Sequence, residues 1–199
     1  MSSPLRLGAY LLVGILALFE LGVVWLMLHP DVPPEYRAYF IDKTTTCLNQ
    51  PVAGTYSLGT TIPFTPEGRD LAKPIRVCGW EGPVGDGNHA VGTSARLRFV
   101  YPEPARALTL KLRMVAVQRD DHPTQRVQVV VNGETVDTLT VARDPPQDFS
   151  VDLPHSLVTA ASGRIDLELR FPDAVQMGPT DPDNRRRSIK LLSAALIPA

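Results

Sequence analysis

An apolar stretch near the start of the chain, residues 7–28, limits its fold more than any other feature. As a helix rising 1.5 Å per residue, these roughly 22 residues would be about 33 Å long, which matches the hydrocarbon core of a bilayer. Tyr10 and Trp25 lie near its ends, where aromatic rings prefer the membrane interface. The stretch is longer than the apolar part of a signal peptide, and no small-x-small cleavage site follows it. We therefore predict an uncleaved transmembrane anchor.

Glu20 is the one charged residue inside this apolar stretch. A carboxylate at this depth costs roughly 2–3 kcal/mol or more if the segment crosses a bilayer. The side chains one helical turn away offer it no polar group: Leu16, Ala17, Val23 and Val24. We expect its partner to come from another chain, from backbone or from bound water. Glu20 is therefore our candidate for an intramembrane contact with other transmembrane subunits.

The charges that flank the anchor predict its orientation. Arg6 precedes the anchor, whereas Asp31 and Glu35 follow it before Arg37. The positive-inside rule then favours a cytoplasmic N-terminus. We predict a protein of the bacterial inner membrane, with its C-terminal domain in the periplasm.

Cys47 and Cys78 are the two cysteines of the chain, and both follow the anchor. In an exported domain an even cysteine count favours a disulfide over the alternative of two buried free thiols. Closing a loop of about 30 residues would contribute roughly 3–4 kcal/mol in the chain-entropy model. Neither cysteine has a second Cys or a His at zinc-ligand spacing, so a metal site is not expected there.

The rest of the chain has the pattern of an all-β domain. Asn132-Gly133 is the preferred pair for a type I′ hairpin turn, and alternating stretches flank it. Other stretches alternate apolar and polar residues with the period of half-buried strands: residues 95–101, 108–117, 149–153, 164–171 and 188–198. No amphipathic helix is evident after the anchor. We predict an antiparallel β-sandwich, jelly-roll-like and extracytoplasmic, with one N-terminal transmembrane helix.

The expected organisation has three parts. Residues 1–30 form the cytoplasmic N-terminus and the anchor, and residues 73–199 form the sandwich. Between them, residues 31–72 are poor in strand signals. We interpret this segment as a stalk with an edge element, which the predicted disulfide fastens to the sandwich.

From Cys78 to the C-terminus the chain resembles a jelly-roll module of bacterial membrane-associated envelope proteins, which is often appended to membrane glycosyltransferases. The resemblance rests on Gly79-Trp80 and on four strand motifs: residues 95–100, 129–133, 149–154 and 183–191. The chain departs from that pattern in two places. The segment after Gly79-Trp80 keeps an acidic residue, Glu81, but lacks the further aromatics, and Arg187 and Ser188 replace an apolar residue and a glycine in the closing strand. Such modules are taken as non-catalytic, so the resemblance implies a fold and a compartment.

Other motifs indicate little chemistry. The balance of 20 basic and 21 acidic residues gives no excess charge for holding nucleic acid. Gly85, Gly87 and Ala90 fit a dinucleotide fingerprint formally, but neither a preceding strand nor a following helix is predicted. The four histidines are scattered, and we interpret them as exposed loop residues: His29, His89, His122 and His155. We expect no enzymatic activity and no cofactor.

One loop could bind calcium. Asp181, Asp183 and Asn184 offer oxygen ligands, but the remaining ligands of a calcium site are missing from the spacing. The alternative is a turn in which these side chains cap backbone amides. We predict no metal, with these three residues as a weak Ca²⁺ candidate.

Two hypotheses for the function remain. The first is an accessory subunit that docks on a larger membrane complex (photosynthetic, respiratory or polysaccharide-exporting) through its helix and sandwich. The alternative is a membrane-tethered glycan-binding module in envelope polysaccharide synthesis. For the second, Trp80 and Tyr101 are the candidate sugar platforms, although packing in the core is the competing interpretation of Trp80.

Overall fold

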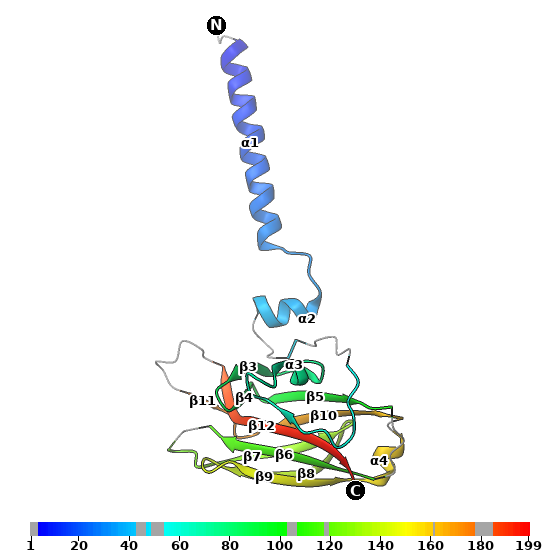
Figure 1. The fold of residues 1–199 in the computed structure, drawn as a ribbon. Coiled ribbons are helices and arrows are strands. Elements are labelled where there is room, and N and C mark those ends of the chain that lie inside the picture. The colour runs from blue at the N-terminus through cyan, green and yellow to red at the C-terminus, as the bar shows by residue number, and fades with distance from the viewer. Residues whose placement is uncertain are drawn as a thin grey trace. The chain divides into compact units, whose positions relative to one another are not determined.

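The computed structural model describes residues 4–42, 47–48, 54–102, 107–117, 120–160, 162–177 and 185–199. The chain divides into two compact units, Met1–Asp42 and Lys43–Ala199. Figure 1 shows the first unit as helical and the second as a sandwich of strands. Asp181, Asp183 and Asn184, the weak calcium candidates, lie outside the described residues.

The first unit begins with the apolar helix α1, Pro4–Leu28. Its section Leu7–Leu28 is long and apolar enough to cross a membrane, a property that anchors share with signal sequences. The His29 amide still donates to the Trp25 carbonyl at 3.0 Å, but Pro30 has no N–H with which to continue the ladder. A short helix α2 (Pro34–Tyr36) runs directly into a π-helical turn η1 (Arg37–Ile41).

The second unit consists of two antiparallel sheets within the described residues, which confirms the predicted sandwich. We name them by their central strands. The β12 sheet has the order β3 (Trp80–Val84), β4 (Gly87–Val91), β12 (Arg186–Pro198), β6 (Leu108–Ala116), β9 (Gln147–Leu153). Two short strands, β1 (Ile62–Pro63) and β11 (Val175–Gln176), also pair with β12. The β10 sheet has the order β2 (Arg76–Cys78), β5 (Ser94–Val100), β10 (Arg164–Arg170), β7 (Thr124–Val131), β8 (Glu134–Ala142).

The core lies between the inner faces of the two sheets. Side chains alternate along each strand, so every second residue of β5 is buried, as Leu97 and Phe99 are. These residues pair with Leu167 and Ile165 of β10, so apolar residues line up across the strands. The alternation predicted from sequence is therefore confirmed for the central strands.

The predicted hairpin turn is also confirmed. Asn132 and Gly133 have φ of 50° and 91°, the left-handed values that a type I′ turn requires at both central positions. Val131 and Glu134 pair on either side of them. The Asn132 side chain is used as well, because its amide oxygen accepts the Asp166 backbone N–H at 2.9 Å.

Two features differ from the expectations. Two short helices, α3 (Arg69–Ala72) and α4 (His155–Ala160), were not expected after the anchor. The sequence did not predict them because a helix of one or two turns is too short to show an apolar periodicity. Tyr56, Ile62 and Phe64, which fall in the segment interpreted as stalk and edge element, are buried core residues of the sandwich.

Gly79 is the point at which the chain changes sheets, since β2 belongs to the β10 sheet and β3 to the β12 sheet. Its φ is +78°, a conformation that residues with a Cβ rarely adopt. A Cβ there would lie 2.4 Å from the Ser94 carbonyl oxygen and 2.7 Å from the Ala95 Cα. The Gly-Trp motif thus begins with the one residue type that fits this corner.

Candidate functional site

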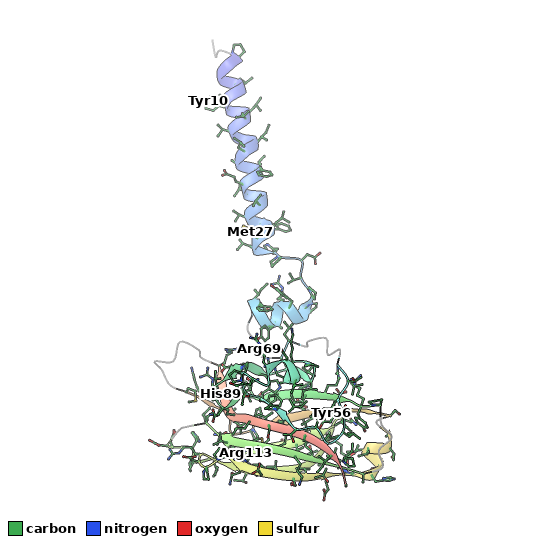
Figure 2. All side chains as sticks on the ribbon, in the orientation of Figure 1. Tyr10, Met27, Tyr56, Arg69, His89 and Arg113 are labelled. Carbon is green, nitrogen blue, oxygen red and sulfur yellow. A yellow bond between two sulfur atoms is a disulfide. The ribbon has the colours of Figure 1, made fainter. Side chains whose placement is uncertain are left out.

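A group of titratable residues lies on strands β3, β4 and β12 and on the turn between β3 and β4, and we call it the His89 cluster: Glu81, Asp86, His89, Arg187 and Lys190. Figure 2 labels His89 on this part of the sandwich. His89 is half-buried on β4 and pairs with Lys190 of β12. Because side chains alternate along a strand, it points to the face opposite the buried Ala90.

The loop interpretation of His89 was wrong, because the residue belongs to a strand and its side chain is half-buried. The surrounding stretch lacks the helix that must follow the glycines of a dinucleotide fingerprint. Indeed Gly87–Val91 is strand β4, and another strand, β5, follows it. No polar–apolar alternation marks this strand in the sequence, because Ala90 and Val91 are both apolar and both buried.

Glu81 accepts a hydrogen bond from the Arg187 guanidinium at 2.9 Å and a longer one from Arg185 at 3.4 Å. The Glu81 and Arg187 side chains are only 19% and 20% exposed, so this ion pair is more shielded from water than most surface pairs. Lys190 donates to the Asp86 carboxylate at 2.6 Å. The cluster therefore contains two ion-paired carboxylates, Glu81 and Asp86, whose charges both act on the His89 imidazole.

Burial lowers the pKa of His89, and the positive charges of Lys190 and Arg187 lower it further, while Glu81 and Asp86 oppose the shift. The imidazole is therefore neutral at neutral pH, with one nitrogen that donates and one that accepts. Its Nδ1 is buried and has no hydrogen-bond partner within the part of the chain that the structure describes. The hydrogen bond from Lys190 lowers the pKa of Asp86, which keeps that carboxylate charged.

This arrangement offers donors and acceptors side by side on one strand surface. The carboxylate oxygens accept and the Lys190 ammonium donates, whereas the burial of Nδ1 leaves only the other ring nitrogen of His89 to meet a ligand. Such a set suits a ligand with many hydroxyl groups, each of which donates and accepts. Among the described residues no group of three or more His, Cys, Asp or Glu side chains could hold a metal ion.

Trp80 has a packing role. Its indole N–H donates to the Arg96 carbonyl at 2.9 Å, which joins the edge of the β12 sheet to the β10 sheet. Its ring centroid lies 5.7 Å from that of the buried Phe64. The packing interpretation of Trp80 therefore accounts for both its ring and its polar atom.

Tyr101 cannot serve as the sugar platform considered for it, because its side chain is only 3% exposed. A sugar stacks on an open aromatic face, and the fold buries this ring in the core. The alternation of residues 95–101 already places Tyr101 on the same side as Leu97 and Phe99.

The other sequence candidates are placed as follows. Cys47 and Cys78 form a disulfide, as predicted. Glu20 lies on α1, where its side chain is exposed. The His89 cluster contains neither Glu20, nor the two cysteines, nor Trp80.

A second charged surface covers the outer face of the β10 sheet, and we call it the arginine ladder. Asp166 bonds Arg98 at 2.5 Å and Arg164 at 2.6 Å. Glu168 is held in the same way by Arg96 at 3.2 Å and Arg170 at 2.9 Å. Each carboxylate thus joins its own strand to a neighbour, and charge pairing satisfies both carboxylates.

No family model and no curated protein matches this sequence. Among solved structures, the chain is similar to carbohydrate-binding module CBM36 in complex with calcium and xylotriose, at 12% identity and a TM-score of 0.40 over 69% of this chain and 98% of that one. It is also similar to a family 35 carbohydrate-binding module from Clostridium thermocellum, at 9% identity and a TM-score of 0.42 over 71% and 100%. A third is CsCBM6-3 from Clostridium stercorarium in complex with cellobiose, at 15% identity and a TM-score of 0.41 over 74% and 100%. The sandwich class itself follows from the pairing of the two sheets.

Proposed function

We propose that this chain is a membrane-anchored, non-catalytic binding module whose sandwich binds a polyhydroxylated ligand, an envelope glycan, at the His89 cluster. The observation that carries the proposal is the grouping of a half-buried imidazole, His89, with two ion-paired carboxylates, Glu81 and Asp86, and the Lys190 ammonium. These groups are held by ion pairs and by a strand backbone, so little side-chain freedom is lost when a ligand binds.

The apolar helix and the disulfide support the proposed location. We propose that α1 is an uncleaved inner-membrane anchor with a cytoplasmic N-terminus and that the sandwich is periplasmic. A disulfide between Cys47 and Cys78 fits an oxidising compartment such as the periplasm. A tethered module of this kind would hold a glycan near the membrane.

Affinity electrophoresis or pull-down of the full chain in detergent, over a panel of envelope polysaccharides, tests the binding site. We expect retention on one polysaccharide class and its loss in His89→Ala and Glu81→Gln. The matched control is Lys111→Ala, on the outer face of β6, where the Lys111 ammonium donates to the Ser150 hydroxyl at 2.6 Å and belongs to no part of the cluster. Absence of retention on every polysaccharide, or retention that the two cluster variants leave unchanged, would refute this site.

A second candidate function is favoured by Glu20. Here the chain is an accessory subunit, and α1 packs against a helix of a larger membrane complex. An exposed carboxylate on an apolar helix would cost roughly 2–3 kcal/mol or more at the bilayer centre, so a polar partner within the membrane would stabilise it.

Co-purification from native membranes in mild detergent tests this second candidate. We expect Glu20→Leu to reduce the recovery of partner proteins. Glu20→Gln, which keeps a hydrogen-bonding group at the same position, should retain most of it. A wild-type chain that runs as a monomer with nothing bound would refute the accessory-subunit hypothesis without affecting the glycan hypothesis.

A further inference from the structure

The short helical segment that follows the apolar helix carries a cluster of exposed aromatic residues. We call α2 and η1 together, residues 34–41, the aromatic segment. The Tyr36 and Phe40 rings lie 4.5 Å apart between centroids, and Tyr39 meets Phe40 edge-on at 4.7 Å. Tyr36, Phe40 and Ile41 remain 44%, 49% and 44% exposed. None of the residues of η1 is buried.

Such exposure is costly in water. Burying a large apolar side chain is worth about 1.5–3 kcal/mol, so three neighbouring ones favour an apolar environment strongly. Contiguous exposed apolar residues mark interaction surfaces. The surroundings of the segment indicate which surface this is.

The segment is held close to the end of α1. Five residues, 29–33, separate it from Leu28, and at about 3.3–3.6 Å per residue they reach at most roughly 18 Å. The linker is also folded, because the Arg37 guanidinium donates to the Pro30 carbonyl at 3.2 Å and the Val32 amide donates to the same carbonyl at 3.1 Å. The aromatic segment therefore stays within reach of the membrane surface from which α1 would emerge.

The chemistry of the segment matches that surface. Tyr rings favour the boundary between headgroups and acyl chains, and Arg reaches from there toward lipid phosphates. The end of α1 has the same character, since the Trp25 and His29 rings stack 4.8 Å apart. The two aromatic groups would then lie in one interfacial layer.

We propose that the aromatic segment lies in the membrane interface, with Tyr36, Phe40 and Ile41 turned toward the acyl chains, and that its occupant is the lipid bilayer. This inference rests on the proposed anchor function of α1. It converts the expected stalk into a second membrane contact, which would restrict how far the sandwich can move from the bilayer.

Fluorescence of an added tryptophan in proteoliposomes tests the proposal. The full chain carries two substitutions. Trp25→Phe removes one native tryptophan, so that Trp80 alone gives background fluorescence, and Phe40→Trp adds the reporter ring. Vesicles are made of phosphatidylcholine, with or without bromine near the carbonyl end of the acyl chains. We expect the added emission to be blue-shifted and mostly lost in brominated vesicles, because the ring would lie about 5–10 Å deep. Tyr36→Trp is a second reporter if Phe40→Trp fails to fold.

The control is Leu71→Trp, since Leu71 is exposed on the sandwich. Flotation of the same vesicles tests the anchor separately. Protein that fails to float overturns the anchor and this inference together. If the protein floats but bromine quenches the tryptophan at position 40 or 36 no more than the one at position 71, the anchor stands and only the interfacial placement of the aromatic segment is overturned. A blue-shifted but unquenched reporter means that protein covers the segment, which also overturns the inference.

Discussion

Ser188 of β12 donates a hydrogen bond to the Gln125 side-chain oxygen of β7 at 3.1 Å, and neither residue has any exposed surface. The bond connects the two sheets through the core. Ser188 is a departure from the envelope-module pattern in the closing strand, and the structure supplies a reason for it, because its hydroxyl satisfies a buried amide oxygen.

We therefore expect Ser188→Ala to destabilise the sandwich by about 1–3 kcal/mol, the cost of leaving a buried polar atom unpaired. Urea unfolding in detergent, followed by the fluorescence of Trp80 with Trp25 replaced by Phe, measures the free energy of unfolding. Adding Gln125→Leu to the variant should recover much of the loss. A double variant that is weaker than Ser188→Ala alone would contradict this account.

Replacing Gly79 with Ala should be among the most damaging single changes in the sandwich. The left-handed conformation alone costs a residue with a Cβ about 1–2 kcal/mol, and the clash with Ser94 and Ala95 adds to it. We expect a loss of at least roughly 2 kcal/mol in the same urea assay. Gly82→Ala is the matched control, because a Cβ at Gly82 meets nothing within 4 Å. Equal effects of the two substitutions would argue against a strained corner.

The arginine ladder predicts a loss of stability in acid. Burial raises the pKa of Asp166, but the hydrogen bonds and charges of Arg98 and Arg164 outweigh burial and lower it. A pKa that is lower in the folded chain contributes stability above the unfolded value of about 4, and this stability is lost as the pH falls through the folded value. Unfolding in urea at pH 7 and at pH 3 measures the change.

Asp166→Asn should reduce that acid dependence and weaken the sandwich at pH 7. Because the Asp166 side chain is 38% exposed, water and salt screen the pairs, and we expect only about 0.5–1 kcal/mol. The control is Asp148→Asn, whose partner Arg113 lies at 3.3 Å, with both side chains more exposed than those of the Arg98–Asp166 pair. An acid dependence that is identical in wild type and Asp166→Asn would rule out the ladder as its source.

The lowered pKa of His89 predicts a separate change in the free energy of unfolding near neutral pH. Its pKa is lowered by burial, so the folded chain takes up its proton at a lower pH than the unfolded chain does. The stability that this provides is complete above the unfolded pKa of about 6.5 and is lost as the pH falls toward the folded value. The free energy of unfolding, measured between pH 7.5 and pH 5, should therefore fall in wild type and stay flatter in His89→Gln. The control His155→Gln, on α4, should follow wild type, and a flattened curve there would point to another cause.

Removing the disulfide should cost about 3–4 kcal/mol in the chain-entropy model, because Cys47 and Cys78 close a loop of 31 residues. Cys47→Ser together with Cys78→Ser should show this loss in urea without reductant. Wild type treated with reductant should approach the double variant. A wild-type chain whose stability is the same with and without reductant, despite complete thiol release, would contradict the prediction.

The sequence by itself determined the apolar helix, the strand alternation, the Asn132-Gly133 turn and the pairing of the two cysteines, since each depends on local periodicity, on backbone preference or on a count of two. Only the tertiary structure decided the site and the fate of two aromatic rings. Glu81 meets Arg187, and His89 pairs with Lys190, both partners lying some hundred residues later in the chain. They meet because β12 pairs with β4, and no local pattern encodes that pairing. Trp80 and Tyr101 were both candidate sugar platforms. The alternation of residues 95–101 already places Tyr101 on the side of Leu97 and Phe99, but how completely each ring is buried is a property of the assembled sheets. The second sheet covers Tyr101, and the edge between the two sheets holds Trp80.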